Sequence, residues 1–376
     1  MTSRERVEAA LNHREPDRVP IDLNATNVSG MQASSVYKLR QALKLDPPGT
    51  PVKVFEPFQM LGDPGDDLLD AIGADAVGVR MPYTMFGYKI TGWKPWTLFD
   101  GTPVLVPEAF NTEPNERGDL LQYPQGDYSA PASARMPKGG FYCDTIIRQE
   151  PIDDEKLNPL DNCEEFAELS DDDLSYLANE CDRAYASGRA IVASLPGMAF
   201  GDIAFVPGPG LRYPKGIRDV EEWYMSTVER PDYVEAVFDR QLEIALKNLP
   251  KLHEALGDKP SAVFTSGTDF GAQSGPFVSP RAFRKLYAPR LKAVNDWIHA
   301  NTTWKTFIHS CGSIQPLLPD IIAAGFDIIN PVQTSAANMA PTDLKGRFGD
   351  QLTFWGGGVD TQHTLPLASA DEIRAG

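Results

Sequence analysis

The sequence predicts an α/β protein with a parallel sheet, most simply a TIM-type (β/α)8 barrel. Strand-like apolar runs alternate with helical segments through the last third of the chain, as in βα units. Four of these runs end in polar or small side chains, at the position where such a barrel carries its active site. Four polar strand ends in succession favour the barrel over the alternative, a doubly wound sheet.

Short helices and strands are expected before residue 90. The segment SRERVEAALNH is a short amphipathic helix, and Pro16 and Pro20 bracket the start of a first strand, IDL. A second helix covers SSVYKLRQALKL. The run DDLLDAIGADAVGVR predicts a helix, a stop at Gly73 and a strand.

Residues 90–140 do not follow this pattern. WTLFDGTPVLVP consists of two β-patterned runs around Asp100-Gly101, a strong hairpin signal. The residues after it are rich in Pro, Gly and Ser. We interpret the region as an irregular hairpin and loop insertion in a single barrel domain spanning residues 1–376. It is either a layer that covers a site or an exposed excursion.

The middle of the chain returns to helices and a strand. SDDDLSYLANECDRAYASG begins at Ser170, a good N-cap, and its Asp run suits the positive end of a helix. RAIVASLPG is predicted as a buried strand that ends at Pro196-Gly197. Residues 220–257 are expected to form two helices, broken near Arg230-Pro231.

The last third supplies most of the candidate site residues. We expect sequential parallel strands at 261–267, 306–312, 326–333 and 352–360, with helices between them. The polar residues at or after the ends of these strands are Asp269, His309, Cys311, Asn330, Gln333, Asp360, Gln362 and His363.

Composition excludes several classes of partner. A net charge of −17 repels phosphate backbones and anionic lipids, so neither nucleic acid nor membrane is expected as a partner. No apolar run approaches the roughly 20 residues of a membrane helix, and the charged start lacks the pattern of a signal peptide. Four cysteines in 376 residues do not form a disulfide framework. These features predict a soluble, cytoplasmic protein that acts on a small molecule.

The pair in FIHSCGS is the sharpest candidate. Side chains alternate along a strand, so His309 and Cys311 point to the same side. Imidazole and thiolate are preferred zinc ligands, but a catalytic zinc normally takes three protein ligands. The other cysteines lie in the first half of the chain. From spacing alone, a buried strand whose His and Cys are satisfied by neighbours stays an open alternative.

The segment FIHSCGSIQPLLPDIIAAGFDIINPVQ, followed by LTFWGGGVDTQHTLP, resembles the uroporphyrinogen decarboxylase superfamily. The resemblance is clearest over about 261–366, with weaker similarity in RVEAALNHREPDRVPI and LLDAIGADAVGV. The turn GGGVDT departs from the family pattern, with Gly357 in place of Asn and Thr361 in place of Pro. The resemblance implies a (β/α)8 barrel.

Two branches of that superfamily differ at visible residues. Decarboxylases carry an arginine-rich segment after the first strand, where this chain has IDLNATNVSGMQ, and an aspartate near the position of Arg80 and Pro82. They have a Gly-rich turn at the position of HSCG, whereas the corrinoid-dependent zinc methyltransferases have His-x-Cys-Gly. The resemblance is thus closer to the methyltransferases and implies that His309 and Cys311 bind zinc.

The third ligand of that branch has no match in this chain. In the methyltransferases it is a cysteine near the C-terminus, and no cysteine follows Cys311 here. Ser369 and Glu372 predict a capping box that starts a helix, yet the sequence stops at Gly376. We therefore expect that the final βα segment is missing, and that the barrel is incomplete or irregular on its C-terminal side.

The resemblance implies transfer of a methyl group between a corrinoid (a methylcobamide) on a partner protein and a thiol or similar acceptor. It also implies a homodimer. Zinc would bind and deprotonate the thiol. We assign catalytic roles to His363 and Asp269, with His363 as a candidate proton carrier. The candidate substrate-binding residues are Asn330, Gln333, Asp360, Gln362 and Arg80.

Two other functions stay open. The first is a uroporphyrinogen decarboxylase-like enzyme acting on a carboxylated tetrapyrrole or related acid, with Arg80, Arg212 and Lys215 as scattered cations. The second is a barrel that binds a corrinoid or a small acid without turnover. Zinc content separates the methyltransferase from both.

Overall fold

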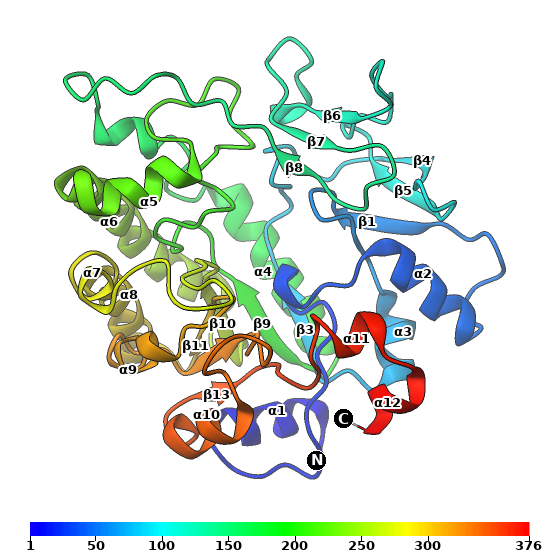
Figure 1. Cartoon of the computed structure of the whole chain (residues 1–376). Helices are drawn as coiled ribbons and strands as arrows, with labels where there is room; N and C mark the ends of the chain where they lie inside the picture. Colours follow the sequence, from blue (N-terminus) through cyan, green and yellow to red (C-terminus); the bar gives the residue numbers. More distant parts are fainter. Residues whose placement is uncertain (376) are drawn as a thin grey trace.

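A six-stranded parallel sheet forms the centre of the computed structural model, which describes residues 1–375 (Figure 1). The strand order is β13-β12-β11-β10-β9-β3. The strands span Ala76–Val79 (β3), Ala190–Ser194 (β9), Ala262–Ser266 (β10), Lys305–His309 (β11), Ile328–Asn330 (β12) and Thr353–Phe354 (β13). Strands β10 to β13 are neighbours in both sequence and space, as predicted. The parallel α/β architecture is confirmed.

All four strands predicted for the last third are shorter than expected: β10 by one residue at each end, β11 by three residues at its end, and β12 and β13 by more. Strand β12 stops at Asn330 because Pro331 follows it and has no N–H to donate to a ladder. Strand β13 stops at Phe354, well before residue 360, and the glycines that follow include Gly356 and Gly357 at φ +125° and +76°. Glycine reaches such backbone conformations without strain, so the chain leaves the sheet there.

Helices connect the strands and cover one face of the sheet (Figure 1). The α-helices are Ser3–Leu11 (α1), Ala33–Ala42 (α2), Gly65–Ile72 (α3), Asp171–Ala186 (α4), Val220–Glu229 (α5), Pro231–Leu256 (α6), Pro280–Ala282 (α7), Ala288–Asn301 (α8), Leu318–Ala323 (α9), Pro341–Phe348 (α10), Thr364–Leu367 (α11) and Ala370–Ala375 (α12). A π-turn at Phe283–Tyr287 joins α7 to α8, and short 3-10 turns span Asn27–Ser29, Pro124–Gly126, Pro159–Asn162 and Gln315–Leu317.

Local signals predicted these helix ends well. The Ser170 hydroxyl accepts a hydrogen bond from the Asp173 amide, as its N-cap role requires. Gly73 ends α3 in the left-handed conformation, at φ 68°. The capping box of Ser369 and Glu372 is also present at the start of α12. None of the helices in the described residues is long and apolar enough to cross a membrane.

Two smaller sheets lie beside the parallel sheet (Figure 1). One has the order β2-β1-β5-β4, from Leu61–Gly62, Val52–Glu56, Pro103–Pro107 and Trp93–Thr97. The other has the order β6-β7-β8, from Leu120–Gln122, Ala134–Met136 and Asp144–Thr145. Strands β4 and β5 pair antiparallel around Asp100 and Gly101, so the predicted hairpin is confirmed. Strands β1 and β2, which were not predicted, lie in the same sheet as this hairpin.

Side chains of the parallel sheet alternate between two apolar clusters. Ile191, Val263, Ile308 and Ile329 pack in the large core that includes the helices. The opposite face carries the inner cluster, which includes residues of α1 and of β3, β9, β10, β11 and β12. Its members are Val7, Leu11, Ala25, Ala76, Ala190, Val192, Ala262, Phe307 and Ile328, with Phe264 and Trp355 packed against them. The residues that follow the inner cluster along each strand lie at the carboxyl ends of the strands.

The predicted first strand at 21–23 is wrong: no strand forms there. The Asp22 carboxylate accepts a hydrogen bond from the Ala25 amide, and this local turn competes with extended pairing. The segment still bridges the two edges of the sheet. The Ile21 carbonyl accepts a bond from the Asp75 amide beside β3, and Asp22 accepts one from the Trp355 indole after β13. Closure as an eight-stranded barrel, like the single-domain organisation, stays a prediction.

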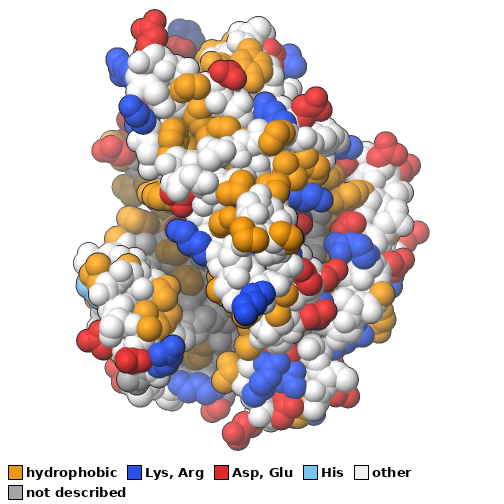
Figure 2. All heavy atoms as spheres, turned by 90° about the vertical axis from the view of Figure 1, so that its right-hand side faces the viewer, with side chains coloured by type: hydrophobic (Ala, Val, Ile, Leu, Met, Phe, Trp, Pro, Cys, Tyr) orange, Lys and Arg blue, Asp and Glu red, His pale blue; other side chains and the backbone are white. Residues whose placement is uncertain are grey.

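Charged side chains of both signs are mixed over the face seen in Figure 2. Lysine and arginine side chains are scattered there among aspartate and glutamate, with hydrophobic side chains between them. This face therefore shows no basic patch of the kind that binds a phosphate backbone.

Candidate metal site

His309 ends strand β11 with its imidazole fixed by a neighbouring strand. Its Nδ1 lies 2.6 Å from Oδ1 of Asn330 at the end of β12. The Asn330 Nδ2 donates to the Trp355 carbonyl at 2.7 Å, which leaves Oδ1 as the acceptor for an imidazole N–H. Nε2 of His309 therefore carries the lone pair, as a metal ligand must.

Cys311 lies beside that lone pair. Its Sγ is 3.4 Å from Nε2 of His309. Strand β11 ends before Cys311, and Gly312 turns the chain at φ +81°. A Cβ at Gly312 would lie 2.3 Å from the Gly271 carbonyl oxygen, so only glycine fits this turn. The amide of Gly312 is held by Oε1 of Gln333 at 2.8 Å.

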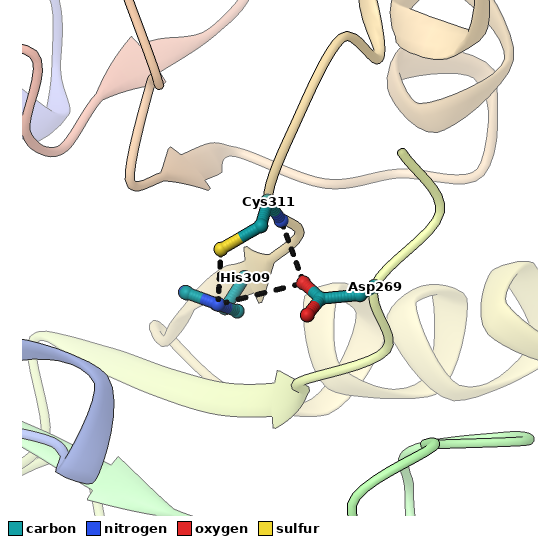
Figure 3. A group of neighbouring side chains, drawn as sticks. All are labelled: Asp269, His309 and Cys311. Carbon is teal, nitrogen blue, oxygen red and sulfur yellow. Dashed lines mark hydrogen bonds and ion pairs between the residues drawn. The ribbon is translucent and has the colours of Figure 1, made fainter. Parts of the chain in front are cut away.

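Asp269 completes a three-residue group. Its Oδ1 lies 3.6 Å from Nε2 of His309 and accepts a hydrogen bond from the Cys311 amide at 2.6 Å. The three side chains point toward one another (Figure 3), and one ligand atom from each lies within 4.8 Å of the others. Sequence analysis sought the third ligand among the cysteines, whereas the structure places this carboxylate there.

The donor types of the group and two of its donor spacings fit a zinc ion. Zinc bonds of about 2.0–2.3 Å at tetrahedral angles place neighbouring donor atoms about 3.3–3.8 Å apart. The Sγ–Nε2 and Oδ1–Nε2 distances are 3.4 and 3.6 Å. Three protein donors leave one tetrahedral position for a substrate atom, as in catalytic zinc sites.

The thiol is protonated unless a cation is present. Burial, together with the Asp269 carboxylate beside it, raises the pKa of the Cys311 thiol to about 12. Metal binding must therefore displace a proton from sulfur, which makes metal affinity rise with pH. The side chains of His309 and Asp269 are 12% and 28% exposed, so the group is reachable from solvent.

Asn330 and Gln333 lie next to the Asp269–His309–Cys311 group, where their side chains hold His309 and the Gly312 turn in place. Both side-chain atoms of the Asn330 amide are engaged, by His309 and by Trp355. Oε1 of Gln333 holds the Gly312 amide. Their predicted role in substrate binding stays a prediction.

The other predicted residues near the C-terminus form a separate turn. Asp360 accepts hydrogen bonds from the backbone amides of Gln362 and His363, and the His363 ring lies 3.1 Å from it. The His363 side chain is 75% exposed. Among residues 1–375, no hydrogen bond or ion pair joins this turn to the Asp269–His309–Cys311 group. The roles predicted for these three residues stay predictions.

Asp202 is a buried carboxyl that sequence analysis missed. It lies in the loop after β9, and its Oδ1 accepts a bond from the Ala204 amide. Burial and the charge of Asp269 raise its pKa to about 6. A lone Asp in the Gly-rich segment after the β9 strand carries little signal in sequence, because only the fold brings that loop near Asp269.

Comparisons with known proteins show a shared fold. Neither the protein-family models nor the curated proteins compared with the chain give a match. Among solved structures, the chain is similar to a methyltransferase from Methanosarcina mazei, with 16% identity and a TM-score of 0.51. The match covers 100% of this chain and 88% of that one. At this identity, the similarity shows that the two chains share an overall fold.

Proposed function

We propose that the chain is a zinc-dependent methyltransferase with a (β/α)8-type fold, related to the corrinoid-dependent branch of the uroporphyrinogen decarboxylase superfamily. The geometry of the Asp269–His309–Cys311 group carries the proposal. The resemblance of the HSCG segment to that branch supports it, as does the fold shared with a methyltransferase. The reaction proposed is transfer of a methyl group between a corrinoid on a partner protein and a thiol or similar acceptor.

Three atoms would hold the ion: Nε2 of His309, Sγ of Cys311 and a carboxylate oxygen of Asp269. When bound, zinc supplies the Lewis acidity that lets a thiol lose its proton at neutral pH. The chain itself supplies the geometry. Asn330 keeps the lone pair of the imidazole on Nε2, and the Cys311 amide keeps the Asp269 carboxylate beside that imidazole.

In the proposed reaction the thiolate of the substrate would form a bond to the methyl carbon, while the bond between carbon and cobalt would break and leave its electron pair on the cobalt of the partner's corrinoid. The proposed reaction takes place at the carboxyl ends of β10 and β11. His309 is the last residue of β11, and Asp269 follows shortly after the end of β10. Strand ends are rigid supports, so the donor atoms keep their spacing while substrate enters and leaves.

Metal content and activity test the proposal together. Protein from zinc-supplemented cells should hold one zinc per chain and transfer methyl from methylcobalamin to a thiol, as followed by cobalamin absorbance. Cys311→Ser removes the soft donor at nearly constant volume, so it should lose zinc and lower the rate at least a hundredfold. The fold should remain, because the helices and the large core do not depend on this side chain.

Cys163→Ser is the matched control. Its Sγ lies 3.4 Å from the Pro159 carbonyl oxygen, and a serine hydroxyl can make the same bond. This variant should keep zinc and activity. A Cys311→Ser protein with full zinc and full activity would sink the proposal. Release of carbon dioxide from a carboxylated tetrapyrrole by zinc-free protein would favour the decarboxylase instead.

A further inference from the structure

Arg80 follows strand β3 and points to the inner side of the sheet. Ala76 belongs to the inner cluster, and a Cβ at Gly78 would meet the Ala25 carbonyl on that side. Val77 and Val79 pack in the opposite, helix-covered core. Alternation therefore places Arg80 on the inner side, one step beyond Gly78.

The guanidinium of Arg80 has only neutral partners in the described residues. Nη1 donates to Oδ1 of Asn27 at 3.3 Å, and Nη2 donates to the Asn24 carbonyl at 3.1 Å. Its carbon lies 4.1 Å from the centre of the Phe55 ring. No ion pair of Arg80 is present within residues 1–375, and burial lowers its pKa to about 10. Arg80 is half-buried, and a partly desolvated cation is stabilised by a complementary anion, so such a partner would be favoured.

Three carboxyl groups influence Arg80 without pairing with it. They are Asp22, Glu56 and Asp63. The Glu56 oxygens accept the amides of Phe58 and Gln59, and Asp22 accepts the Trp355 indole N–H. Burial raises the pKa values of both Asp22 and Glu56. None of the three carboxyl groups lies within ion-pair distance of Arg80 in the described residues, so no anion contacts its guanidinium directly there.

Arg80 and the metal group lie at the same end of the sheet. His309 shares its side of β11 with Phe307, an inner-cluster residue, just as Arg80 shares the side of Ala76. Strand order separates β3 from β11 by three steps, about 14 Å of sheet at about 4.8 Å per step.

Hydrogen bonds also link the two places. The Asn24 carbonyl that holds Arg80 belongs to the segment of Asp22, which is bonded to Trp355. The Trp355 carbonyl orients Asn330, and Asn330 orients His309.

We propose that Arg80 binds an anionic group of the small substrate, a carboxylate, sulfonate or phosphate, whose other end reacts at the Asp269–His309–Cys311 group. The placement of the reacting end rests on the proposed function, whereas the anion site does not. Arginine has five N–H donors in a planar fork, and two of its nitrogens have neutral partners here, so donors remain for an anion.

The first experiment needs no metal. Full-length protein freed of metal by a chelator is titrated by calorimetry with propionate, methanesulfonate and inorganic phosphate. At least one should bind saturably, and Arg80→Gln should weaken that binding at least tenfold, while Arg80→Lys retains part of it. Arg281→Gln, which changes an exposed arginine, should bind as the wild type does. Equal binding by wild type and Arg80→Gln, or none by any of the three anions, would overturn the anion site.

The second experiment tests where the reacting end lies. Cobalt(II)-substituted protein is titrated with mercapto acids of increasing length, from mercaptoacetate to mercaptohexanoate, and with the matching mercapto alcohols. The increase in metal–thiolate absorption above that due to Cys311 itself reports binding of the added thiol. One acid should bind at least tenfold more tightly than its alcohol, and Arg80→Gln should abolish that preference without weakening the alcohol. If none of the added thiols increased this absorption, the metal proposal would be rejected. The metal-free titration would still decide the anion site. Equal affinities of acids and alcohols would reject Arg80 as the substrate's anchor.

Discussion

Asp269 is held in place by a backbone amide 42 residues further along the chain, that of Cys311. The contact does two things at once: it fixes the loop that carries the thiol, and it aims the carboxylate at the imidazole. A side chain fixed in this way loses little rotamer freedom when an ion binds, so the group is largely preorganised. A fixed orientation of this kind distinguishes a preorganised group from three polar side chains that lie together by chance.

Glu56 gives a prediction for pH at the same scale. It is 3% exposed, and burial raises its pKa from 4.5 to about 7. Between those values the unfolded chain loses its proton and the folded chain keeps it, so the free energy of unfolding should fall as pH rises. The shift is worth roughly 3 kcal/mol across that window. Glu56→Gln should remove this decline, as measured by urea unfolding at pH 5 and pH 8.

The matched control for Glu56 is Glu116→Gln, which changes an exposed glutamate of the insertion at residues 90–140. It should keep the wild-type dependence on pH. Glu56→Gln also loses one acceptor for the amides of Phe58 and Gln59, so its stability should be lower in absolute terms. Only the change with pH bears on the prediction, and parallel curves for Glu56→Gln and wild type would contradict it.

At the scale of elements, the segment of residues 21–25 takes the place where a first strand was expected. It lies against β3 so closely that a Cβ at Gly78 would come within 2.4 Å of the Ala25 carbonyl oxygen. Backbone atoms cannot move aside cheaply, so Gly78→Ala should push the segment away from β3. We expect a loss of about 1–3 kcal/mol in the free energy of unfolding, measured with denaturant.

Gly346 provides the contrast to Gly78. It lies within α10, and an added Cβ there would meet no heavy atom within 4 Å. Gly346→Ala should therefore stabilise the protein by about 0.5–1 kcal/mol, because alanine is the better helix former. If both substitutions changed stability equally, the close contact of Gly78 would not be a determinant of the fold.

Sequence patterns predicted the elements whose cause is local. The Ser170 cap, the Gly73 stop and the hairpin at Asp100-Gly101 all depend on a few neighbouring residues, and all three are present. The strand at 21–23 failed because the Asp22 side chain forms a turn with Ala25. The strands β1 and β2 were not foreseen, since β1 pairs with β5, which lies far along the chain, and β2 pairs with β1.

The candidate site divides in the same way. The two-residue spacing of His309 and Cys311 predicted that both side chains point to one side, and their ligand atoms do meet. Strand β11 ends at His309, however, so the turn at Gly312, and not alternation along a strand, positions the thiol. The position of Asp269 beside them depends on the pairing of β10 with β11. The support given by Asn330 depends on β12, and that of Asp22 on the far edge of the sheet. No pattern within one segment contains those contacts.

At the scale of the whole molecule, the metal group lies at the carboxyl ends of strands whose core is already packed. The large cluster of apolar side chains joins the sheet to α4, α6 and α8 without any contribution from Asp269, His309 or Cys311. We therefore expect the chain to fold without metal. Chelation should leave the far-ultraviolet circular dichroism spectrum unchanged.

Zinc binding to the folded state alone should still raise thermal stability. At a free concentration of about a hundred times Kd, the gain is roughly 2.7 kcal/mol. Differential scanning calorimetry with and without zinc measures it, and Cys311→Ser should show little of the shift. Unfolding of the wild type on chelation would mean that the site is structural and not catalytic.

The bond between Trp355 and Asp22 also bears on the order of events during synthesis. A nascent chain that had emerged only as far as Cys311 would contain all three donor residues. It would still lack Asn330, which orients His309, and Trp355, whose carbonyl holds Asn330 and whose indole is held near the N-terminus by Asp22. The ribosome must therefore release nearly the whole described chain before the imidazole is locked, so insertion of the metal is expected to be a post-translational step.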